Sequence, residues 1–170
     1  MLKIRMRTPL KALLLGGLAL SAAAVPAGAE QATGKSFVEK FDRLDKSRWY
    51  VSDGWSNGDH QNCTWSAGQV SVQDGKLRLG FARKRYKDRD HVCGEIQTNA
   101  RFGYGTFEAR MKAVAGSGLN TGFFSYIGPV DKQPHDEIDF EVLGKDPSKV
   151  QVNQYVNAKS VGSAKLAEVP

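Results

Sequence analysis

The first 29 residues contain no acidic side chain, although the chain of 170 residues has 18 acids in all. Four basic residues occur there, followed by the apolar run 12–25 and then by Ala27 and Ala29, small residues spaced as at a cleavage site. This order of basic, apolar and small residues is typical of a secretory signal peptide. We therefore predict a leader over residues 1–29 and a secreted or periplasmic protein.

The sequence also lacks a long hydrophobic segment. A membrane-spanning helix needs about 20 consecutive apolar residues, and the run 12–25 is shorter. We expect no membrane association after cleavage; the alternative is an uncleaved N-terminal anchor. Residues 30–170 then fit a single domain.

Little net charge remains once the leader is set aside. Without its four basic residues, 20 basic residues face 18 acidic ones, a net charge of +2. This balance does not predict binding to nucleic acid. The densest basic segment, "RKRYKDR" (83–89), contains an acid, and we interpret it as a solvated loop in a polar connection. A docking site for an acidic polymer is the alternative.

Cysteine is scarce: only Cys63 and Cys93 are present. An even number of cysteines in an exported chain favours a disulfide over a metal site or a catalytic thiol. Two free buried thiols are the alternative.

Helical periodicity is almost absent, and short alternating runs take its place. Turn residues such as Gly75, Gly116, Gly118 and Gly144 stand between these runs, a pattern that indicates an all-β, antiparallel β-sandwich or barrel. After residue 157 the alternation is lost, and no closing strand is expected there. The predicted strands are 76–82, 105–113, 121–128 and 149–157.

The segment "PHDEIDFEVLG" (134–144) places Glu137, Asp139 and Glu141 at alternate positions with apolar residues between them. On a strand, the three carboxylates share one face. They are compatible with a solvent-facing strand paired to lysines, with calcium binding, or with glycosidic chemistry. Glycosidases use two carboxyl groups about 5–5.5 Å apart for retention of configuration and about 6.5–9.5 Å apart for inversion.

The stretch "DEIDFEVLGKD" resembles the active-site strand of glycoside hydrolase family 16, and the absence of an extra residue before the last Glu resembles the lichenase-like branch, the endo-β-1,3-1,4-glucanases. Further segments are similar to lichenase segments in the same order, and the chain also resembles secreted glycanases that trim succinoglycan. The resemblance implies a jelly-roll sandwich with a concave sugar-binding face, incomplete at its C-terminus because family members extend further. These segments are "SNGDHQNCTW", "VCGE", "FGYGTFEARMK", "TGFFSYIGP" and "KVQVNQYVN".

The resemblance also implies roles for the three carboxylates. Glu137 corresponds to the nucleophile, Asp139 to an assisting carboxylate and Glu141 to the general acid/base. Because a second negative charge beside ionised Glu137 is unfavourable, we expect Asp139 to share a proton with it. The chemistry implied is double displacement at an acetal carbon, with retention of configuration.

Other matching positions line the sugar cleft of the family, and Cys63 and Cys93 match its disulfide. As alternatives, Asn57 serves a turn, and Phe124 and Tyr155 belong to the core. Trp55 and Trp65 are candidate stacking platforms, with packing of Trp65 against the disulfide as the alternative. The implied substrate-binding residues are Asn57, Glu95, Phe124, His135, Asn153 and Tyr155.

Two positions depart from the lichenase pattern. His135 stands where lichenases usually have Trp, and Gln97 stands where they have Arg. Loss of a stacking ring and a cation predicts a different glycan rather than lost chemistry. We expect a monomer that acts on a β-glucan or exopolysaccharide, with no cofactor and no metal.

Two classes of function follow from these residues. The first is an exported endo-acting β-glycanase, and the second is a truncated or non-catalytic glycan-binding relative. The presence of all three carboxylates favours the enzyme.

Overall fold

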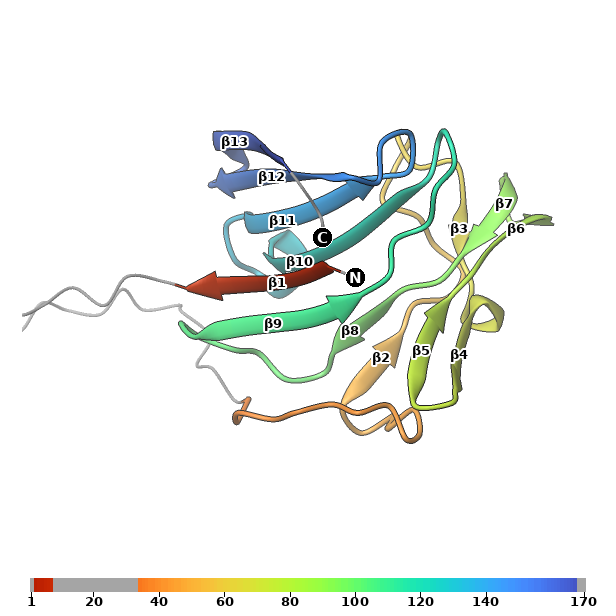
Figure 1. The fold of residues 1–170 in the computed structure, drawn as a ribbon, viewed down its shortest axis with the longest axis horizontal. Coiled ribbons are helices and arrows are strands. Elements are labelled where there is room, and N and C mark those ends of the chain that lie inside the picture. The colour runs from red at the N-terminus through yellow and green to blue at the C-terminus, as the bar shows by residue number, and fades with distance from the viewer. Residues whose placement is uncertain (1, 8–33, 168–170) are drawn as a thin grey trace, which may run out of the picture. The chain divides into compact units, whose positions relative to one another are not determined.

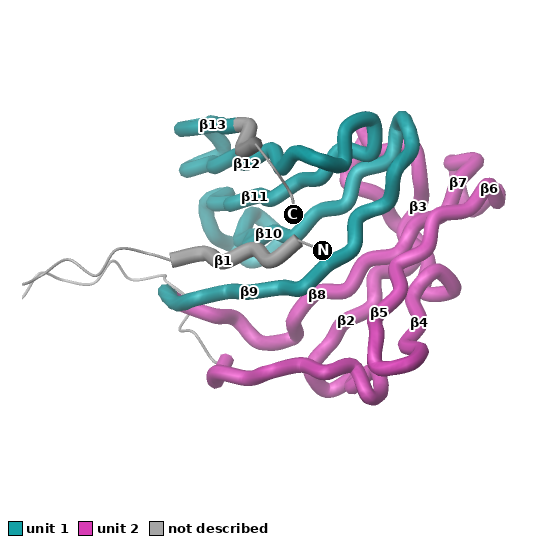
Figure 2. Tube along the Cα trace, in the orientation of Figure 1, with its two compact units in different colours: residues 1–30, 104–170 teal, residues 31–103 magenta. Residues whose placement is uncertain are grey.

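The computed structural model describes residues 2–7 and 34–167, with side chains over 34–164. The predicted leader run and its cleavage site after Ala29 lie outside the described residues. The chain divides into two compact units, one of residues 31–103 and one of residues 1–30 with 104–170 (Figure 2). Within the described part of the chain, no helix is both long and apolar enough to span a lipid bilayer.

Strands account for nearly all regular structure in the described residues, with two single-turn 3₁₀ helices (Figure 1). The prediction of an all-β chain is confirmed. The unit of residues 31–103 contains β2 (Trp49–Val51), β3 (Thr64–Trp65), η1 (Ala67–Gln69), β4 (Val70–Gln73), β5 (Lys76–Leu79), β6 (Phe81–Tyr86), β7 (Arg89–Cys93) and β8 (Ile96–Thr98). The other unit contains β1 (Leu2–Arg7), β9 (Thr106–Met111), β10 (Asn120–Ile127), η2 (Pro129–Asp131), β11 (Asp136–Leu143), β12 (Lys149–Val156) and β13 (Lys159–Ala167).

Three small sheets make up the unit of residues 31–103. They pair β2 with β8, β4 with β5, and β3 with β7 and β6. All pairs are antiparallel except β3 with β7, which run parallel. Cys63 and Cys93 form the predicted disulfide, with Cα atoms 5.8 Å apart. Beside it, Val92 and Thr64 are almost completely buried.

The predicted strand 76–82 is wrong in one respect, because it is divided at Gly80. The Gly80 N–H donates to the carbonyl of Gln69 (2.7 Å), and its own carbonyl accepts from Gly94 (3.0 Å). A Cβ at Gly80 would lie 2.6 Å from the Gln69 side chain. The chain therefore leaves the pairing with β4 and enters the pairing with β7 at Gly80, where a larger residue would displace the Gln69 side chain.

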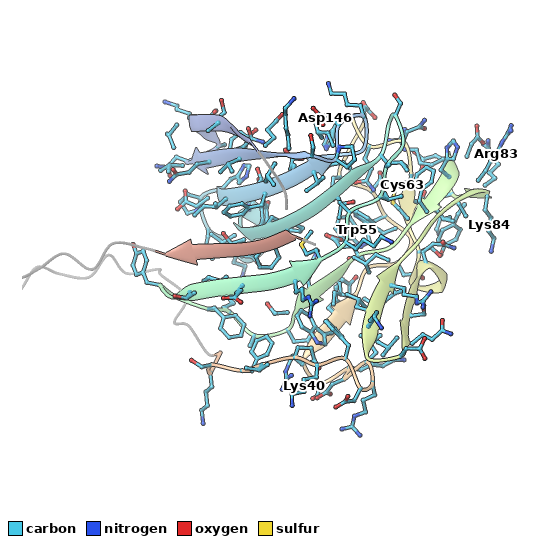
Figure 3. The ribbon with its side chains drawn as sticks, in the orientation of Figure 1. Lys40, Trp55, Cys63, Arg83, Lys84 and Asp146 are labelled. Carbon is cyan, nitrogen blue, oxygen red and sulfur yellow. A yellow bond between two sulfur atoms is a disulfide. The ribbon has the colours of Figure 1, made fainter. Side chains whose placement is uncertain are left out.

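Residues 83–89 were predicted to be a loop, and this prediction is wrong as well. They belong to the β6–β7 hairpin, in which Tyr86 pairs with Arg89 and Lys87 has a φ of 56°. Arg83 and Lys84 extend from this hairpin into solvent (Figure 3). Most of these side chains are exposed as expected, but Tyr86 and Arg89 are half-buried and the backbone is paired.

The other unit is dominated by a four-stranded antiparallel sheet in the order β10–β11–β12–β13 (Figure 1). One of its faces carries the apolar cluster of Val142 and Val150, with Phe123, Phe140 and Val152 packed against them. The predictions for 121–128 and 149–157 agree with β10 and β12 to within a residue or two. In the same unit, β1 pairs antiparallel with β9 through residues that fall inside the predicted leader.

Strand β13 corrects the expectation that no strand follows residue 157. It pairs antiparallel with β12 after a tight turn in which Asn157 and Ala158 both have positive φ, 50° and 62°. Its residues include Ser160, Gly162 and Ser163, which give little hydrophobic alternation. Backbone pairing to β12, rather than side-chain pattern, makes this segment a strand.

Candidate active site

The register of β10, β11 and β12 decides which side chains surround the three acids. On β10, Tyr126, Phe124 and Gly122 lie opposite Glu137, Asp139 and Glu141 respectively. On β12, the corresponding partners are Tyr155, Asn153 and Gln151. Since side chains alternate between the faces of a sheet, these nine residues share one face.

This face is open to solvent, whereas the opposite face carries the apolar cluster. Phe124 and Tyr126 are 41% and 44% exposed. Nothing lies within 4 Å of where a Cβ would stand at Gly122, directly across from Glu141. Phe124 is therefore a surface aromatic beside Asp139 and not a core residue. The sheet face beside the carboxylates is thus accessible to solvent at Gly122, Phe124 and Tyr126.

Glu137 is held by two residues close to it in the sequence. His135 Nε2 lies 2.7 Å from Oε2 of Glu137, and both side chains are largely shielded, at 26% and 22% exposed. On its other side, Glu137 is hydrogen-bonded to Asp139. The candidate nucleophile thus has two polar partners, one of which is a carboxyl group.

Asp139 stands between two other carboxyl groups, and this position changes its protonation. Burial is the largest cause that raises its pKa, followed by the negative charge of Glu137 and the hydrogen bond with it. Glu141 adds a smaller repulsion, and together they raise the pKa of Asp139 to about 7. Since a carboxylate only accepts hydrogen bonds, the shared proton resides on Asp139 and is donated to Glu137. The raised pKa supports the predicted proton sharing, which stays a prediction.

Glu141 is held by two side-chain amides. Asn120 Nδ2 donates to Oε1 (2.6 Å), and Asn153 Nδ2 donates to Oε2 (2.7 Å). The two asparagines come from the strands on either side of β11. They fix the orientation of the candidate acid/base from both flanks. Asn153 therefore lies beside Glu141, whereas the resemblance implied a contact with sugar.

Aromatic rings surround the start of β11. The His135 ring lies 5.6 Å from that of Tyr155 at an angle of 17°, which is a stacked pair, and 5.1 Å from that of Tyr126 at 48°. Burial raises the pKa of the Tyr126 phenol, and the charge of Glu137 raises it further. Gly128 makes room for this phenol, because a Cβ there would collide with Tyr126. Tyr155 accordingly packs on the site face rather than in the apolar core.

Four sequence candidates lie in the unit of residues 31–103, namely Trp55, Asn57, Trp65 and Glu95. Asn57 is exposed in a turn, and its Oδ1 accepts from Trp65 Nε1 (3.3 Å). Trp55 and Trp65 pack edge to face, with centroids 6.3 Å apart, and Trp55 is 37% exposed. Asn57 is therefore hydrogen-bonded to one member of a tryptophan pair, and the ring of the other member, Trp55, is partly exposed to solvent.

Glu95 is buried in the same unit, at 6% exposed. Ser52 Oγ donates to its Oε2 (2.7 Å) and Gln97 Nε2 to its Oε1 (3.2 Å). Burial raises the pKa of Glu95, and these two hydrogen bonds oppose the rise. Gln97, at the position where lichenases have Arg, thus contacts the Glu95 carboxyl directly.

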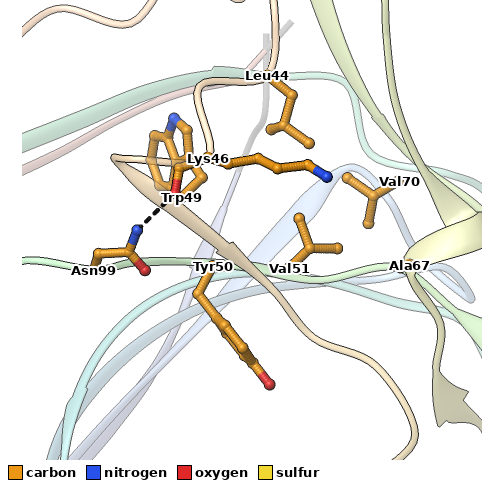
Figure 4. Close-up of a pocket in the computed structure, with 8 residues that line it drawn as sticks. All are labelled: Leu44, Lys46, Trp49, Tyr50, Val51, Ala67, Val70 and Asn99. Carbon is orange, nitrogen blue, oxygen red and sulfur yellow. Dashed lines mark hydrogen bonds between the residues drawn. The ribbon is translucent and has the colours of Figure 1, made fainter.

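The same unit contains a hollow of about 520 Å³, drawn in Figure 4. Its wall includes Trp49, Tyr50 and Lys46, and the Asn99 amide donates to the Lys46 carbonyl (3.0 Å). No carboxylate lines it. It has none of the acid pairs that glycosidic chemistry requires, so the open face of β11 is the candidate active site. Within the described side chains, no group of three or more His, Cys, Asp or Glu is arranged to hold a metal ion.

Sequence reasoning missed Asn120 and Tyr126. Both belong to β10 and occur at period two with Gly122 and Phe124 in "NTGFFSYI". That alternation was visible, but only the pairing of β10 with β11 shows that Asn120 meets Glu141 and that Tyr126 lies across from Glu137.

Comparison with known proteins finds relatives of this chain among the glycoside hydrolases. The family model described as "Glycosyl hydrolases family 16" matches residues 57–168. The chain is 65% identical over 136 residues to the endo-1,3-1,4-beta-glycanase ExoK of Rhizobium meliloti, covering 80% of this chain and 50% of that protein. It is 44% identical over 146 residues to the beta-glucanase of Bacillus subtilis, covering 85% of this chain and 60% of that protein.

A solved structure agrees with these matches. The beta-glucanase of Bacillus licheniformis superposes with a TM-score of 0.75 at 40% identity, covering 79% of this chain and 63% of that chain. The fold is thus of the predicted jelly-roll class. The chain spans about half the length of ExoK and about 60% of the Bacillus subtilis enzyme.

Proposed function

This chain belongs to glycosyl hydrolase family 16, and from that premise we propose that it is a secreted, retaining endo-β-glycanase. One observation carries the proposal: on an open sheet face, Glu137 shares a hydrogen bond with Asp139, while Glu141, four residues after Glu137, is held by two amides. Double displacement uses two carboxyl groups, one as nucleophile and one as acid/base, and Glu137 and Glu141 are our candidates for these two roles.

In the first step, a Glu137 oxygen attacks the anomeric carbon of a bound glycan. The bond from that carbon to the leaving oxygen breaks, and Glu141 gives its proton to this oxygen. The Asp139 proton stabilises the ionised form of Glu137 before attack. Asn120 and Asn153 keep Glu141 aimed from both sides.

In the second step, Glu141 accepts a proton from water, and the water oxygen attacks the anomeric carbon from the side that the leaving group vacated. The ester bond to Glu137 breaks, and its electron pair returns to the carboxylate. Asp139 is then again beside a negative charge, which restores the resting hydrogen bond. Two inversions give net retention.

For the substrate, we propose a β-1,3-1,4-glucan or a related bacterial exopolysaccharide such as succinoglycan. The relatives of this chain include an endo-1,3-1,4-beta-glycanase and a beta-glucanase. His135 is smaller than the Trp of lichenases, and the space over Gly122 is open. Both features suit a branched or acyl-decorated chain. Asn57, Glu95, Phe124 and Tyr155 remain proposed sugar contacts.

For location, we propose cleavage of the leader after Ala29, export to the periplasm or medium, and action as a monomer. The support is the order of basic, apolar and small residues before Glu30 and the disulfide between Cys63 and Cys93.

The test is release of reducing ends from lichenan, laminarin and succinoglycan by the purified chain. We expect activity in the wild type and loss of at least about 1000-fold in Glu137→Gln, which removes the nucleophile but keeps the shape of the side chain. Asp74→Asn is the matched control, since Asp74 lies in the β4–β5 turn, has a φ of 53° and asparagine tolerates this conformation.

Two outcomes decide against parts of the proposal. A clear preference for lichenan over succinoglycan would overturn the decorated substrate. A folded wild-type chain that binds these glycans without cleaving any of them would instead establish the glycan-binding alternative.

A further inference from the structure

We infer that His135 is a positioning residue for the nucleophile, orienting the Glu137 carboxylate through Nε2 within a clamp of two tyrosine rings and a backbone turn. The inference rests on the proposed function, in which Glu137 attacks the sugar. Its basis is a group of contacts that converge on one imidazole ring at the start of β11.

The contact with Glu137 fixes the tautomer of His135. A carboxylate only accepts hydrogen bonds, so Nε2, 2.7 Å from Oε2, carries a proton. This bond holds one of the two carboxylate oxygens and so sets the plane of the carboxylate. Rotation of that plane would change the direction in which the attacking lone pair points.

Rings from both neighbouring strands hold the imidazole. Tyr126 of β10 and Tyr155 of β12 are both direct partners of Glu137 across the sheet. Their rings lie 5.1 Å and 5.6 Å from that of His135, within the range of favourable ring packing. The imidazole therefore has a neighbour on each flank of β11, which restricts its rotation.

The backbone around His135 is tied down as well. The β12–β13 turn reaches back to the start of β11, where Ala158 N–H donates to the His135 carbonyl (2.9 Å). The neighbouring Asn157 N–H donates to Oδ1 of Asp136 (2.9 Å). Side chain and main chain of His135 are thus both fixed, as positioning to a fraction of an ångström demands.

The same hydrogen bond serves both halves of the reaction. During attack, the Glu137 oxygen forms a bond to the anomeric carbon while Glu141 protonates the leaving oxygen, and Glu137 becomes a neutral ester. The His135 N–H then donates to an ester oxygen. When the ester bond breaks and its electron pair returns to Glu137, this N–H stabilises the charge that develops.

The first arm of the test compares His135→Ala with His135→Gln in the full chain, using soluble lichenan as the probe. For His135→Ala we expect kcat to fall about 100-fold with KM changed less than about threefold, because orientation is lost but glycan contacts remain. The Gln amide reaches the same oxygen, so His135→Gln should recover at least a tenth of the wild-type kcat. The control is His60→Ala, at an exposed histidine in the other unit.

A rise in KM with kcat unchanged in both variants would overturn the inference, because His135 would then act only in glycan binding. Equal loss in Ala and Gln variants, with both chains folded by circular dichroism, would overturn it too, since a donor at this position would then be irrelevant to Glu137.

The second arm needs no activity and therefore separates this inference from the proposed function. In chains labelled with ¹⁵N-histidine, we expect the His135 Nε2–H proton to be protected from exchange with water in the wild type, because it is donated to Glu137, and to lose that protection in Glu137→Ala. His60→Ala and His91→Ala assign the other two signals. Equally fast exchange of this proton in the wild type and in Glu137→Ala would overturn the inference, whether or not the wild type cleaves glycan.

Discussion

At the scale of single residues, the three carboxyl groups of the site differ in their hydrogen-bond partners. Glu137 receives donors from His135 and Asp139, and Glu141 receives donors from two amides. Only Asp139 lacks a donor of its own among these contacts, and it is the group that takes up the proton. Mutual repulsion between the three acids is thus relieved by one shared proton and several N–H groups.

The proton on Asp139 predicts a pH-dependent stability. The pKa of this carboxyl rises from an ordinary 3.8 to about 7 on folding. The folded chain binds the proton more tightly, so the stabilisation is complete below about pH 4 and is lost as the pH rises through about 7. Asp139→Asn supplies an amide donor that does not titrate. The difference in unfolding free energy between variant and wild type should therefore grow by about 1–2 kcal/mol from about pH 5 to pH 8, solvent screening included.

Urea unfolding at several pH values measures this difference directly. Asp139→Ala serves as the control that removes both the charge and the donor. A constant offset between Asp139→Asn and the wild type across the range would show that Asp139 does not hold a proton in the folded chain.

The amide pair on Glu141 gives a second prediction at this scale. Asn120→Ala removes the donor to Oε1 and frees one side of the acid/base, so kcat should fall about 10-fold. Asn62→Ala, at an exposed asparagine in the other unit, should leave kcat unchanged. Steady-state hydrolysis of lichenan measures both, and equal rates for Asn120→Ala and wild type would mean that the hydrogen bond has no part in catalysis.

At the scale of elements, the alternation of apolar and polar residues predicted several of the strands. It could not predict which strands pair with one another. The runs 121–128 and 149–157 correspond to β10 and β12 because each alternates clearly. Strand β13 was missed because Ser160, Gly162 and Ser163 carry no hydrophobic signal. The register that brings Asn120 to Glu141 depends on long-range pairing, which no local pattern encodes.

The β12–β13 turn offers a test of local strain. Ala158 has a φ of 62°, a left-handed conformation that disfavours residues with a Cβ. Ala158→Gly should therefore stabilise the folded chain by about 1 kcal/mol and raise Tm by about 2–4 °C. Ala82→Gly, within β6, should lower Tm instead, because glycine weakens a strand. A lower Tm for Ala158→Gly in a thermal melt would contradict this account of the turn.

The disulfide ties the residue before β3 to the end of β7 across 30 positions. On the chain-entropy model, a loop of this length is worth about 3–4 kcal/mol. The double variant Cys63→Ala/Cys93→Ala should lose roughly this amount in urea unfolding. Reductant should lower the stability of the wild type by a similar amount and leave the double variant unchanged. A wild type that is insensitive to full reduction would argue against a structural role of the bridge.

At the scale of the whole molecule, the sequence predicted the family and the fold class, because the motif and several further segments match along most of the chain. It did not predict the division into units of residues 31–103 and of 1–30 with 104–170, because that division depends on contacts between distant segments. The chain spans about half the length of ExoK, so its own activity is the property that most needs measurement.

Export is a further prediction for the whole chain. Expressed with its own leader, the protein should appear outside the cytoplasm with an intact mass that begins at Glu30. Ala29→Asp, which places a charge at the small-residue position, should block cleavage and keep the chain with the membrane fraction. A mature form that still begins at Met1 in the medium would contradict the leader.

The central claim is that Glu137 forms the bond to sugar and Glu141 moves the proton, and chemical rescue with azide tests it most directly. With an aryl β-glycoside of a suitable oligosaccharide, Glu137→Ala plus azide should give the α-glycosyl azide, since azide replaces the carboxylate. Glu141→Ala plus azide should give the β-glycosyl azide by attack on the ester of Glu137. Proton NMR of the anomeric signal distinguishes the two products, and reversed configurations or no azide product from either variant would contradict the account.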